Sequence, residues 1–366
     1  MLFDFFPSRT LTFYLARTFV VRILAVLFML VLVLMMLDLL SNSGDILAYP
    51  GNGEGELLRY VGYRVPQLIA RFVPYSVLLA TIITLVTFNQ NSEVVSMKAA
   101  GMSAHQILAP LLLAAGVVSL ASIVFNEFIV TRATASLKAW EGADFGPIPQ
   151  ETETRSNVYF AAGNNVLTAT LMEGSGKATI LRGVTYYERD TQGMILRRVR
   201  SEIGTFANPG WKLAAPELFD VQQAEDSKLP GPVTVAPELT LDQVELSKVD
   251  PDAQSLPELS RSISALDDAG RRTAELKAKW WHKLSGPLSA LLMPLLGAVA
   301  GFGLARSGQL FARAVIGMAL GFAYFVVDNA ALAMGSFGGY PPLLAAWAPF
   351  LLFLLVGETV LVRTEE

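Results

Sequence analysis

Long apolar runs alternate with polar connections along the chain, and six of these runs are long enough to cross a bilayer. A run of about 20 residues, each rising about 1.5 Å, crosses the ~30 Å hydrocarbon layer. Because lipid offers the backbone no hydrogen-bond partner, each run is predicted to be a helix. The six predicted spans are residues 20–40, 68–88, 107–126, 287–304, 312–333 and 343–362.

The pattern changes to short alternating segments between the third and fourth runs. NVYFAAG, NVLTATLME and ATILRGVTYYER alternate apolar with polar positions, and Gly, Asn, Asp or Pro separates them. Alternation bounded by turn residues predicts strands, and repeated short strands favour a sandwich or jelly roll. The predicted organisation is three membrane helices in 1–129, a β-jellyroll in 130–255, a linker helix in 256–283 and three membrane helices in 284–366.

Composition agrees with a membrane protein that carries a substantial extramembrane part. Hydrophobic residues make up 52% of the chain and charged residues 16%, against about 25% charged residues in soluble domains. The net charge of −4 gives no argument for nucleic-acid binding. There is no Cys, and the two His are not in a ligand-spaced cluster, so no metal site is expected. The first run, Val20–Leu37, is too long for a signal peptide and is expected to be retained.

Positive residues near the ends of the spans predict the orientation. Short cytoplasmic loops carry an excess of Lys and Arg. The segments predicted to be cytoplasmic carry Arg9, Arg17, Arg22, Lys98, Arg306 and Arg363. Loop 334–342 has no charge, whereas loop 41–67 disagrees with this orientation, since it carries Arg59 and Arg64 as well as Glu54 and Glu56. Both termini and the loop at 89–106 are therefore expected in the cytoplasm, with the β domain outside, in the periplasm.

The sequence NSEVVSMKAAGMSAHQI, residues 91–107, separates the second and third spans. It predicts a short helix over about 91–105, capped by Asn91 or Ser92, with Glu93 favoured in the first turn by the exposed amides. A plain chain reversal would need only a few polar residues. The alternatives are a solvated loop and a helix that docks on a cytoplasmic partner, and the apolar and small residues favour docking.

Several separated motifs resemble the LptF/LptG family of lipopolysaccharide export permeases, the membrane subunits of an ABC exporter. SEVVSMKAAGMS is similar to the family's coupling helix, and AAGNNVLTATLMEGSGKATILRGVTYYE to the start of its jellyroll. GPLSALLM, GFAYFVVDN, GYPPLLAAWAP and VDPDAQSLPEL are more similar to the LptG branch than to the LptF branch. The resemblance covers nearly the whole chain and implies an inner-membrane subunit with six spans and a periplasmic jellyroll.

The resemblance implies a transport subunit without a catalytic site or bound cofactor. ATP and Mg would be held by a separate LptB ATPase, present as a dimer, and the other partners would be an LptF-like permease and LptC. Lipopolysaccharide would be the substrate, extracted from the inner membrane for transport to the outer membrane. Glu93 would pair with a basic group on LptB, and such a pair can couple strongly when partly buried. The predicted coupling residues are Glu93, Val94, Met97, Lys98, Gly101 and Met102.

A path for lipopolysaccharide needs apolar walls and cations at the outer rim. The resemblance places spans one and five on this path, with tail contacts from Leu32, Met35, Met36, Leu39, Phe72, Phe322 and Phe325. Arg64 and Arg71 are candidates for the head-group phosphates, because Arg suits bidentate phosphate binding. Ordinary helix packing and snorkelling are the alternatives. Lysines common in the family near the outer end of span one are replaced here by Met35, Ser41 and Asn42. The cations then come from these arginines or the partner permease, or the substrate is less anionic.

Two other classes of function are the alternatives to an exporter subunit. A mechanotransmission-type ABC membrane subunit would bind an ATPase but carry no lipid, and such proteins usually have four spans. An envelope enzyme would need a nucleophile, a metal cluster or an acid pair. GSGKAT lacks the Gly and the Ser or Thr that a phosphate-binding loop requires, since Leu171 and Ala178 stand there. The intramembrane acids Asp38, Asp328 and Glu358 are candidates for helix contacts or for a role in moving substrate.

Overall fold

The computed structural model divides the chain into two compact units. It describes residues 6–147, 155–162, 164–174, 178–221, 225–239, 249–268, 271–298, 302 and 310–365. The first unit, here called the helical unit, comprises residues 1–146, 250–263 and 272–366. The second, the β unit, comprises residues 147–249 and 264–271.

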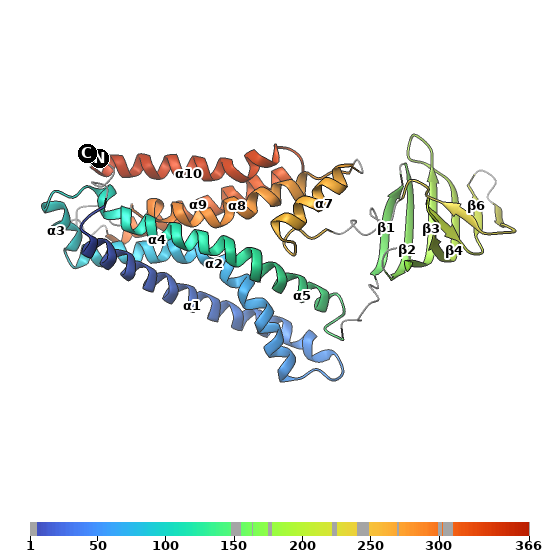
Figure 1. Ribbon diagram of the computed structural model, residues 1–366, viewed down its shortest axis with the longest axis horizontal. Coiled ribbons are helices and arrows are strands. Elements are labelled where there is room, and N and C mark those ends of the chain that lie inside the picture. Colours follow the sequence, from blue (N-terminus) through green and yellow to red (C-terminus); the bar gives the residue numbers. More distant parts are fainter. Residues whose placement is uncertain are drawn as a thin grey trace. The chain divides into compact units, whose positions relative to one another are not determined.

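Long helices lie side by side in the helical unit, and the short helix α3 lies at one end (Figure 1). The beginning of α1 and the end of α10 lie at this same end. The helices are α1 (Arg9–Ala48), α2 (Glu54–Gln90), α3 (Glu93–Ala99), α4 (Ala104–Phe125), a π-helix η1 (Asn126–Val130), α5 (Thr131–Glu141), α7 (Leu256–Asp268), α8 (Ala274–Gly297), α9 (Leu310–Ser336) and α10 (Pro342–Glu365).

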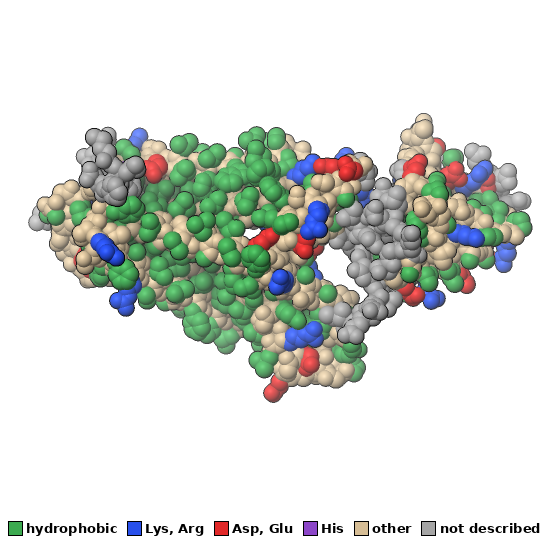
Figure 2. All heavy atoms as spheres, viewed as in Figure 1, with side chains coloured by type: hydrophobic (Ala, Val, Ile, Leu, Met, Phe, Trp, Pro, Cys, Tyr) green, Lys and Arg blue, Asp and Glu red, His purple; other side chains and the backbone are tan. Residues whose placement is uncertain are grey.

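Five helices among the described residues are long and apolar enough to cross a membrane. They are Arg9–Ala48, Glu54–Gln90, Ala104–Glu141, Ala314–Ser336 and Pro342–Arg363. The fourth predicted span begins within α8, and the rest of it, beyond residue 298, falls mostly outside the described residues, as does Arg306. Apolar side chains cover the middle of the helical unit, and charged side chains gather toward its two ends (Figure 2). This is the surface expected of a bundle surrounded by lipid.

The first three spans extend well beyond their apolar runs. The 40 residues of α1, at about 1.5 Å each, are about twice as long as the hydrocarbon layer is thick. Residues 41–67 were expected to be a loop but are helical except at 49–53. Residues 131–141, assigned from the sequence to the β domain, form α5 and continue α4 through η1. These helical ends were not predicted, because their sequences are polar and the prediction relied on apolar runs, which helix formation does not require.

The central core of the helical unit brings α1, α2, α4, α8, α9 and α10 together. Buried residues at the α3 end include Leu15, Phe19 and Phe88. A second cluster joins the far half of α1 to α2 and α5 through Met35, Tyr60 and Trp140. The predicted linker helix over 256–283 is divided into α7 and the first part of α8, with residues 269–270 outside the description.

The β unit is an antiparallel sheet of eight described strands, as the alternating pattern predicted. They are β1 (Arg155–Ala162), β2 (Asn165–Glu173), β3 (Ile180–Arg189), β4 (Ile195–Phe206), β5 (Trp211–Leu213), β6 (Glu217–Asp220), β7 (Glu225–Lys228) and β8 (Val233–Val235). The order is β1-β2-β3-β4-β5-β8, and β6 pairs with both β4 and β7. The buried side chains of these strands form a core that contains Leu167, Val184 and Trp211.

Candidate coupling and lipid-binding sites

The short helix α3 is joined to α2 and α4 by two tight turns. Ser92 precedes α3 in the left-handed region, with φ of 61°, and its side chain does not cap the helix. Instead, the Asn91 side chain donates to Glu93 Oε1 at 3.3 Å. Glu93 occupies the first turn, as predicted, where the exposed amides favour an acid.

Gly101 ends α3 in the left-handed region, with φ of 86°. The Met102 amide donates to Met97 O at 3.1 Å, and the Gly101 amide to Lys98 O at 2.9 Å. This pair of bonds is the Schellman motif, which glycine favours because it has no Cβ. The Ser103 hydroxyl and the Gln106 side chain then cap each other's amides and begin α4. The Gly101 backbone therefore fixes the direction in which the chain returns to the membrane.

The two faces of α3 differ sharply in exposure. Val94 and Met97 are 4% and 8% exposed and pack into the central core. Their contacts with the core hold α3 in place. The outward face instead carries Val95, which is 53% exposed, together with Ser96 and Lys98. Val95 is not among the predicted coupling residues, because two adjacent valines on a seven-residue helix do not reveal which of them faces inward.

Glu93 is linked to the first span by a contact that the sequence did not predict. The Tyr14 hydroxyl, on α1, donates to Glu93 Oε2 at 3.3 Å. The Tyr14 ring lies 6.0 Å from that of Phe88, and Lys98 Nζ lies 5.4 Å from the Phe302 ring centre. The candidate coupling acid is thereby connected to α1, in addition to its covalent links to α2 and α4.

The predicted tail contacts fall into two groups. Leu32, Met36 and Phe322 are 45%, 65% and 64% exposed on the outer surfaces of α1 and α9. Met35 and Phe325 are buried, and Leu39 and Phe72 are partly buried. The exposed group can meet an acyl chain directly, whereas the buried group shapes the helix contacts behind it.

The predicted cation Arg64 is already paired within the chain. Its guanidinium makes two bonds to Asp38, at 2.8 Å and 3.1 Å, and a third to Gln67 at 2.9 Å. The Tyr60 hydroxyl also donates to Asp38 at 2.6 Å. This bidentate pair ties α1 to α2 and neutralises Arg64. It also accounts for Asp38 as a contact between helices.

Arg71 differs from Arg64 because it is exposed and makes no hydrogen bond or ion pair with the rest of the described chain. It lies on α2 one turn before Tyr75, whose ring stacks on Phe325 with centroids 3.8 Å apart. Phe72 adds a third ring, 5.5 Å from Tyr75. The sequence identified Phe72 and Phe325 but missed Tyr75 between them. An unpaired cation therefore lies next to a row of aromatic rings that joins α2 and α9.

A second acid, Asp328 on α9, pairs with His282 on α8. Asp328 Oδ2 lies 3.0 Å from His282 Nε2. Asp328 is 6% exposed, and its Oδ1 atom has no partner among the described residues. The pair is a contact between two helices, which was one of the alternatives for this acid.

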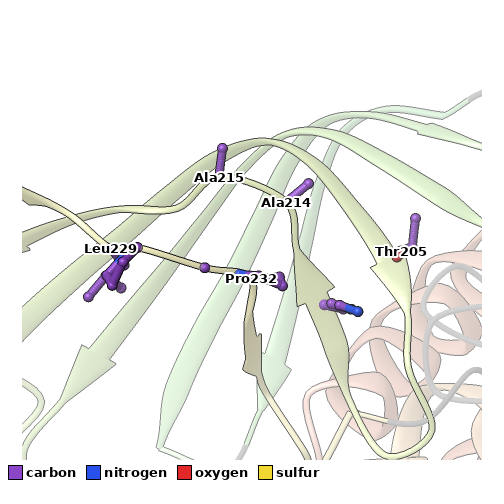
Figure 3. A pocket seen from close by; sticks show the side chains of 8 residues that line it. Thr205, Ala214, Ala215, Leu229 and Pro232 are labelled. Carbon is purple, nitrogen blue, oxygen red and sulfur yellow. The ribbon is translucent and has the colours of Figure 1, made fainter.

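The β unit contributes a shallow groove beside β5 (Figure 3). Its floor and rim are formed by small and apolar residues with one cation, namely Thr205, Lys212, Ala214, Ala215, Leu229, Pro230, Gly231 and Pro232. In the described part of the chain, no group of three His, Asp or Glu could hold a metal ion.

These features define a polytopic membrane protein with a β-sheet unit inserted between its helices and a short exposed helix between two spans. Comparison with known proteins is more specific. The profile described as "Lipopolysaccharide export system permease LptF/LptG" matches residues 13–363. The chain belongs to this family.

Two relatives carry the name lipopolysaccharide export system permease protein LptG. The one from Escherichia coli strain K12 is 25% identical over 368 residues, which cover 98% of this chain and 99% of the relative. The one from Haemophilus influenzae is 22% identical over 315 residues, which cover 84% of this chain and 86% of the relative. The match over almost the full length agrees with the motifs that indicated the LptG branch.

Proposed function

We propose that this chain is the LptG-like subunit of an inner-membrane lipopolysaccharide exporter and that its coupling element is α3. The chain assembles with an LptF-like permease, with LptC and with two copies of LptB. LptB binds and hydrolyses ATP with Mg, and the permeases extract lipopolysaccharide from the inner membrane. Both termini and α3 are cytoplasmic, and the β unit is periplasmic.

The geometry of α3 is the observation that carries this proposal. Its inner face is fixed by Val94 and Met97, so a push on its outer face reaches the core of the bundle. Its outer face presents Val95 and Lys98 beside Glu93. A partner surface with an apolar groove and one basic group complements this arrangement.

The lipid path follows the exposed side chains of α1 and α9. Leu32, Met36 and Phe322 offer apolar surface to acyl chains. Arg71, rather than the neutralised Arg64, supplies a cation for a head-group phosphate. Arginine suits this task because its planar guanidinium can bind two phosphate oxygens at once.

The test is co-purification of LptB with the wild-type complex and with Glu93→Ala, followed by ATPase assays in nanodiscs with and without lipopolysaccharide. The wild type should retain LptB and respond to lipid, and the variant should lose binding or the response. Glu54→Ala is the matched control, because Glu54 is likewise an acid in the first turn of a helix, α2. If wild type brings down no ATPase, α3 is not a coupling element.

The alternative is a mechanotransmission-type subunit that binds an ATPase but carries no lipid. It predicts LptB binding that depends on Glu93, together with an ATPase rate that lipopolysaccharide does not change. Delivery of lipopolysaccharide from proteoliposomes to an acceptor decides between the two. Delivery that requires ATP excludes the alternative.

A further inference from the structure

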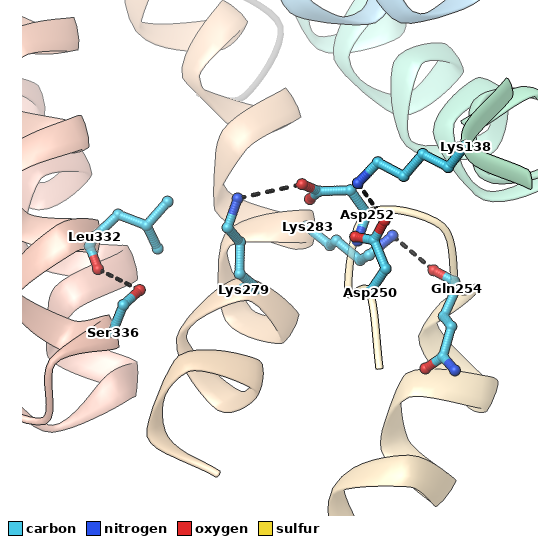
Figure 4. A network of polar contacts seen from close by, with 8 residues as sticks. All are labelled: Lys138, Asp250, Asp252, Gln254, Lys279, Lys283, Leu332 and Ser336. Carbon is cyan, nitrogen blue, oxygen red and sulfur yellow. Dashed lines mark hydrogen bonds and ion pairs between the residues drawn. The ribbon is translucent and has the colours of Figure 1, made fainter. Parts of the chain in front are cut away.

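The chain leaves the helical unit for the strands of the β unit near residue 146 and returns from these strands near residue 250, and these two points are here called the two crossings. The segment at the second crossing, residues 250–256 (PDAQSL preceded by Asp250), is here called the return segment. It has no regular secondary structure before α7, yet it is held by side chains of α5, η1 and α8, and Figure 4 shows the contacts from α5 and α8. Such density of polar contacts is unusual for an irregular connection, since loops are ordinarily mobile.

Three lysines hold the return segment by its polar groups. Lys138 of α5 pairs with Asp250. Lys279 of α8 lies 3.4 Å from Asp252. One turn further along α8, Lys283 donates to Gln254 O at 2.7 Å. Figure 4 shows the three ammonium groups directed at the return segment from two different helices.

The end of the return segment is held by the π-helix. Both Glu127 oxygens accept the Leu256 amide, at 2.9 Å and 3.0 Å. Trp280 Nε1 donates to Leu256 O at 3.3 Å. The next amide toward the N-terminus, that of Ser255, donates to Glu258, which holds the pKa of the Glu258 carboxyl below its ordinary value. The first amides of α7 are therefore satisfied by side chains, as a fixed helix start requires.

The Lys138–Asp250 pair has a special position in the chain. Lys138 lies in the last turn of α5, shortly before the chain leaves for the β unit, and Asp250 lies where the chain returns. The pair therefore joins the two crossings on the helical side. The extra residue of η1 matters here, because a π-helical turn changes which face of α5 meets its neighbours and often marks functional sites.

We propose that the lysine-held return segment is a mechanical link that makes the two crossings move as one with α5 and α8 and so passes movement of the bundle to the β unit during lipid transport. The role of this link in lipid transport rests on the proposed function, whereas the contacts that form it do not. Lys138, Lys279, Lys283 and Glu127 are its positioning residues. They act on lipid through the β unit rather than by touching it.

The test is a charge exchange across the first pair, in the complex with its partners in nanodiscs. Lys138→Glu and Asp250→Lys each place two like charges together, and the double variant restores an opposite pair. Two readouts are needed: amide hydrogen exchange in 250–256, and lipopolysaccharide delivered per ATP hydrolysed. The control is Lys228→Glu, which reverses an exposed lysine that pairs with Glu217 at 3.5 Å in the β unit.

Each single variant should speed exchange in 250–256 by about fivefold, the factor that corresponds to about 1 kcal/mol. Each should also lower lipid delivered per ATP several-fold while LptB remains bound, and the double variant should recover both. The control should change neither. The proposed link is wrong if the single variants leave hydrogen exchange in 250–256 unchanged. It is also wrong if the double variant is as impaired in hydrogen exchange and lipid delivery as the single variants.

The hydrogen-exchange readout needs neither ATP nor lipopolysaccharide, so it separates the two proposals. Suppose that the wild-type complex delivers no lipopolysaccharide, but the single variants still speed amide hydrogen exchange in 250–256 and the double variant restores it. The exporter proposal then fails, whereas the anchoring of the return segment by Lys138 and Asp250 is confirmed. Suppose instead that the variants change hydrogen exchange in 250–256 as expected, but all of them deliver as much lipopolysaccharide per ATP as the wild type. The Lys138–Asp250 pair is then only structural, and the proposed mechanical link is wrong.

Discussion

Two arginines seven residues apart on α2 have opposite electrostatic situations. Arg64 is neutralised by Asp38 and is one-third exposed, with a side-chain exposure of 32%. Arg71 is exposed, and no described residue offers it a carboxylate or a hydrogen bond. Phosphate binding requires a cation whose charge is still available. The difference assigns Arg64 to holding α1 and α2 together, and it leaves Arg71 as the candidate for the head group.

Replacing each arginine with alanine should separate these roles. Arg71→Ala should reduce lipopolysaccharide stimulation of the ATPase several-fold and change stability by less than about 0.5 kcal/mol, since it breaks no contact. Arg64→Ala leaves Asp38 without its cation. It should cost about 1–3 kcal/mol, less than the loss of a fully buried pair because the site is partly exposed. Thermal unfolding of the purified complex and ATPase assays measure both. If Arg64→Ala and Arg71→Ala reduced lipopolysaccharide stimulation of the ATPase equally, the assignment of Arg71 alone to the head group would be contradicted.

Tyr14 provides a further residue-scale prediction. Tyr14→Phe removes the hydroxyl that contacts Glu93 and keeps the ring against Phe88. The lost hydrogen bond joins a neutral hydroxyl to a charged carboxylate at an exposed site, so its loss should cost about 0.5–1 kcal/mol of interaction free energy. This corresponds to an about two- to fivefold weaker stimulation of the ATPase by lipopolysaccharide. LptB should still co-purify.

Thr12→Val is the matched control for Tyr14→Phe. Thr12 lies on the same turn of α1, and Pro7 O, at 3.2 Å, is the one acceptor for its hydroxyl among the described residues. ATPase rates with and without lipopolysaccharide compare the two variants. If Thr12→Val and Tyr14→Phe behave alike, the contact with Glu93 has no part in coupling.

At the scale of elements, periodicity identified the apolar centres of the helices but not their ends. The run TRATASLKAWE has too many polar residues to suggest a span, yet it continues α4 because neighbouring turns and burial of Trp140 support it. A π-helix has no sequence signature that distinguishes it from an α-helix, so η1 could not be predicted. Strands were easier, since alternation with turn residues is visible in the β unit without knowledge of its partners.

Close contact between α9 and α10 gives a prediction at this scale. A Cβ on Gly335 would lie 2.4 Å from the Ala345 Cβ, which belongs to a short, rigid side chain. Gly335→Ala must therefore move a helix, and overpacking of this kind costs about 1–3 kcal/mol. Gly62→Ala is the control, because a Cβ there has no atom within 4 Å.

The control should be neutral or stabilising by about 0.5–1 kcal/mol, since alanine is the better helix former. Thermal unfolding of the two variants in the same detergent measures the difference. A Gly335→Ala variant as stable as Gly62→Ala would show that α9 and α10 are not packed as closely as described.

At the scale of the whole molecule, the candidate site could be predicted only in part. Glu93, the short helix and the exposed tail contacts follow from local sequence and from the family resemblance. The partners of Glu93 and Arg64 do not, because Tyr14 and Asp38 are 79 and 26 residues away and nothing in the local pattern connects them. The return segment is the extreme case, since Lys138 and Asp250 are 112 residues apart.

Orientation is the remaining property of the whole molecule, and the absence of Cys from the sequence makes it directly measurable. Single cysteines can be introduced without removing any native ones. Ser96→Cys lies on the exposed face of α3, and Thr191→Cys lies in the exposed turn between β3 and β4. A membrane-impermeant maleimide should label Thr191→Cys in cells with a permeabilised outer membrane, because the proposed orientation places the β unit in the periplasm.

Ser96→Cys should be labelled only after the inner membrane is broken, since the proposed function places α3 in the cytoplasm, against an ATPase that uses cytoplasmic ATP. Phe337→Cys tests the far ends of the spans independently of the β unit. Phe337 lies in the uncharged loop between α9 and α10 and is 89% exposed, so it should label from outside. The reverse pattern would place α3 outside the cell, where no nucleotide could drive it, and would remove the physical basis for coupling through Glu93.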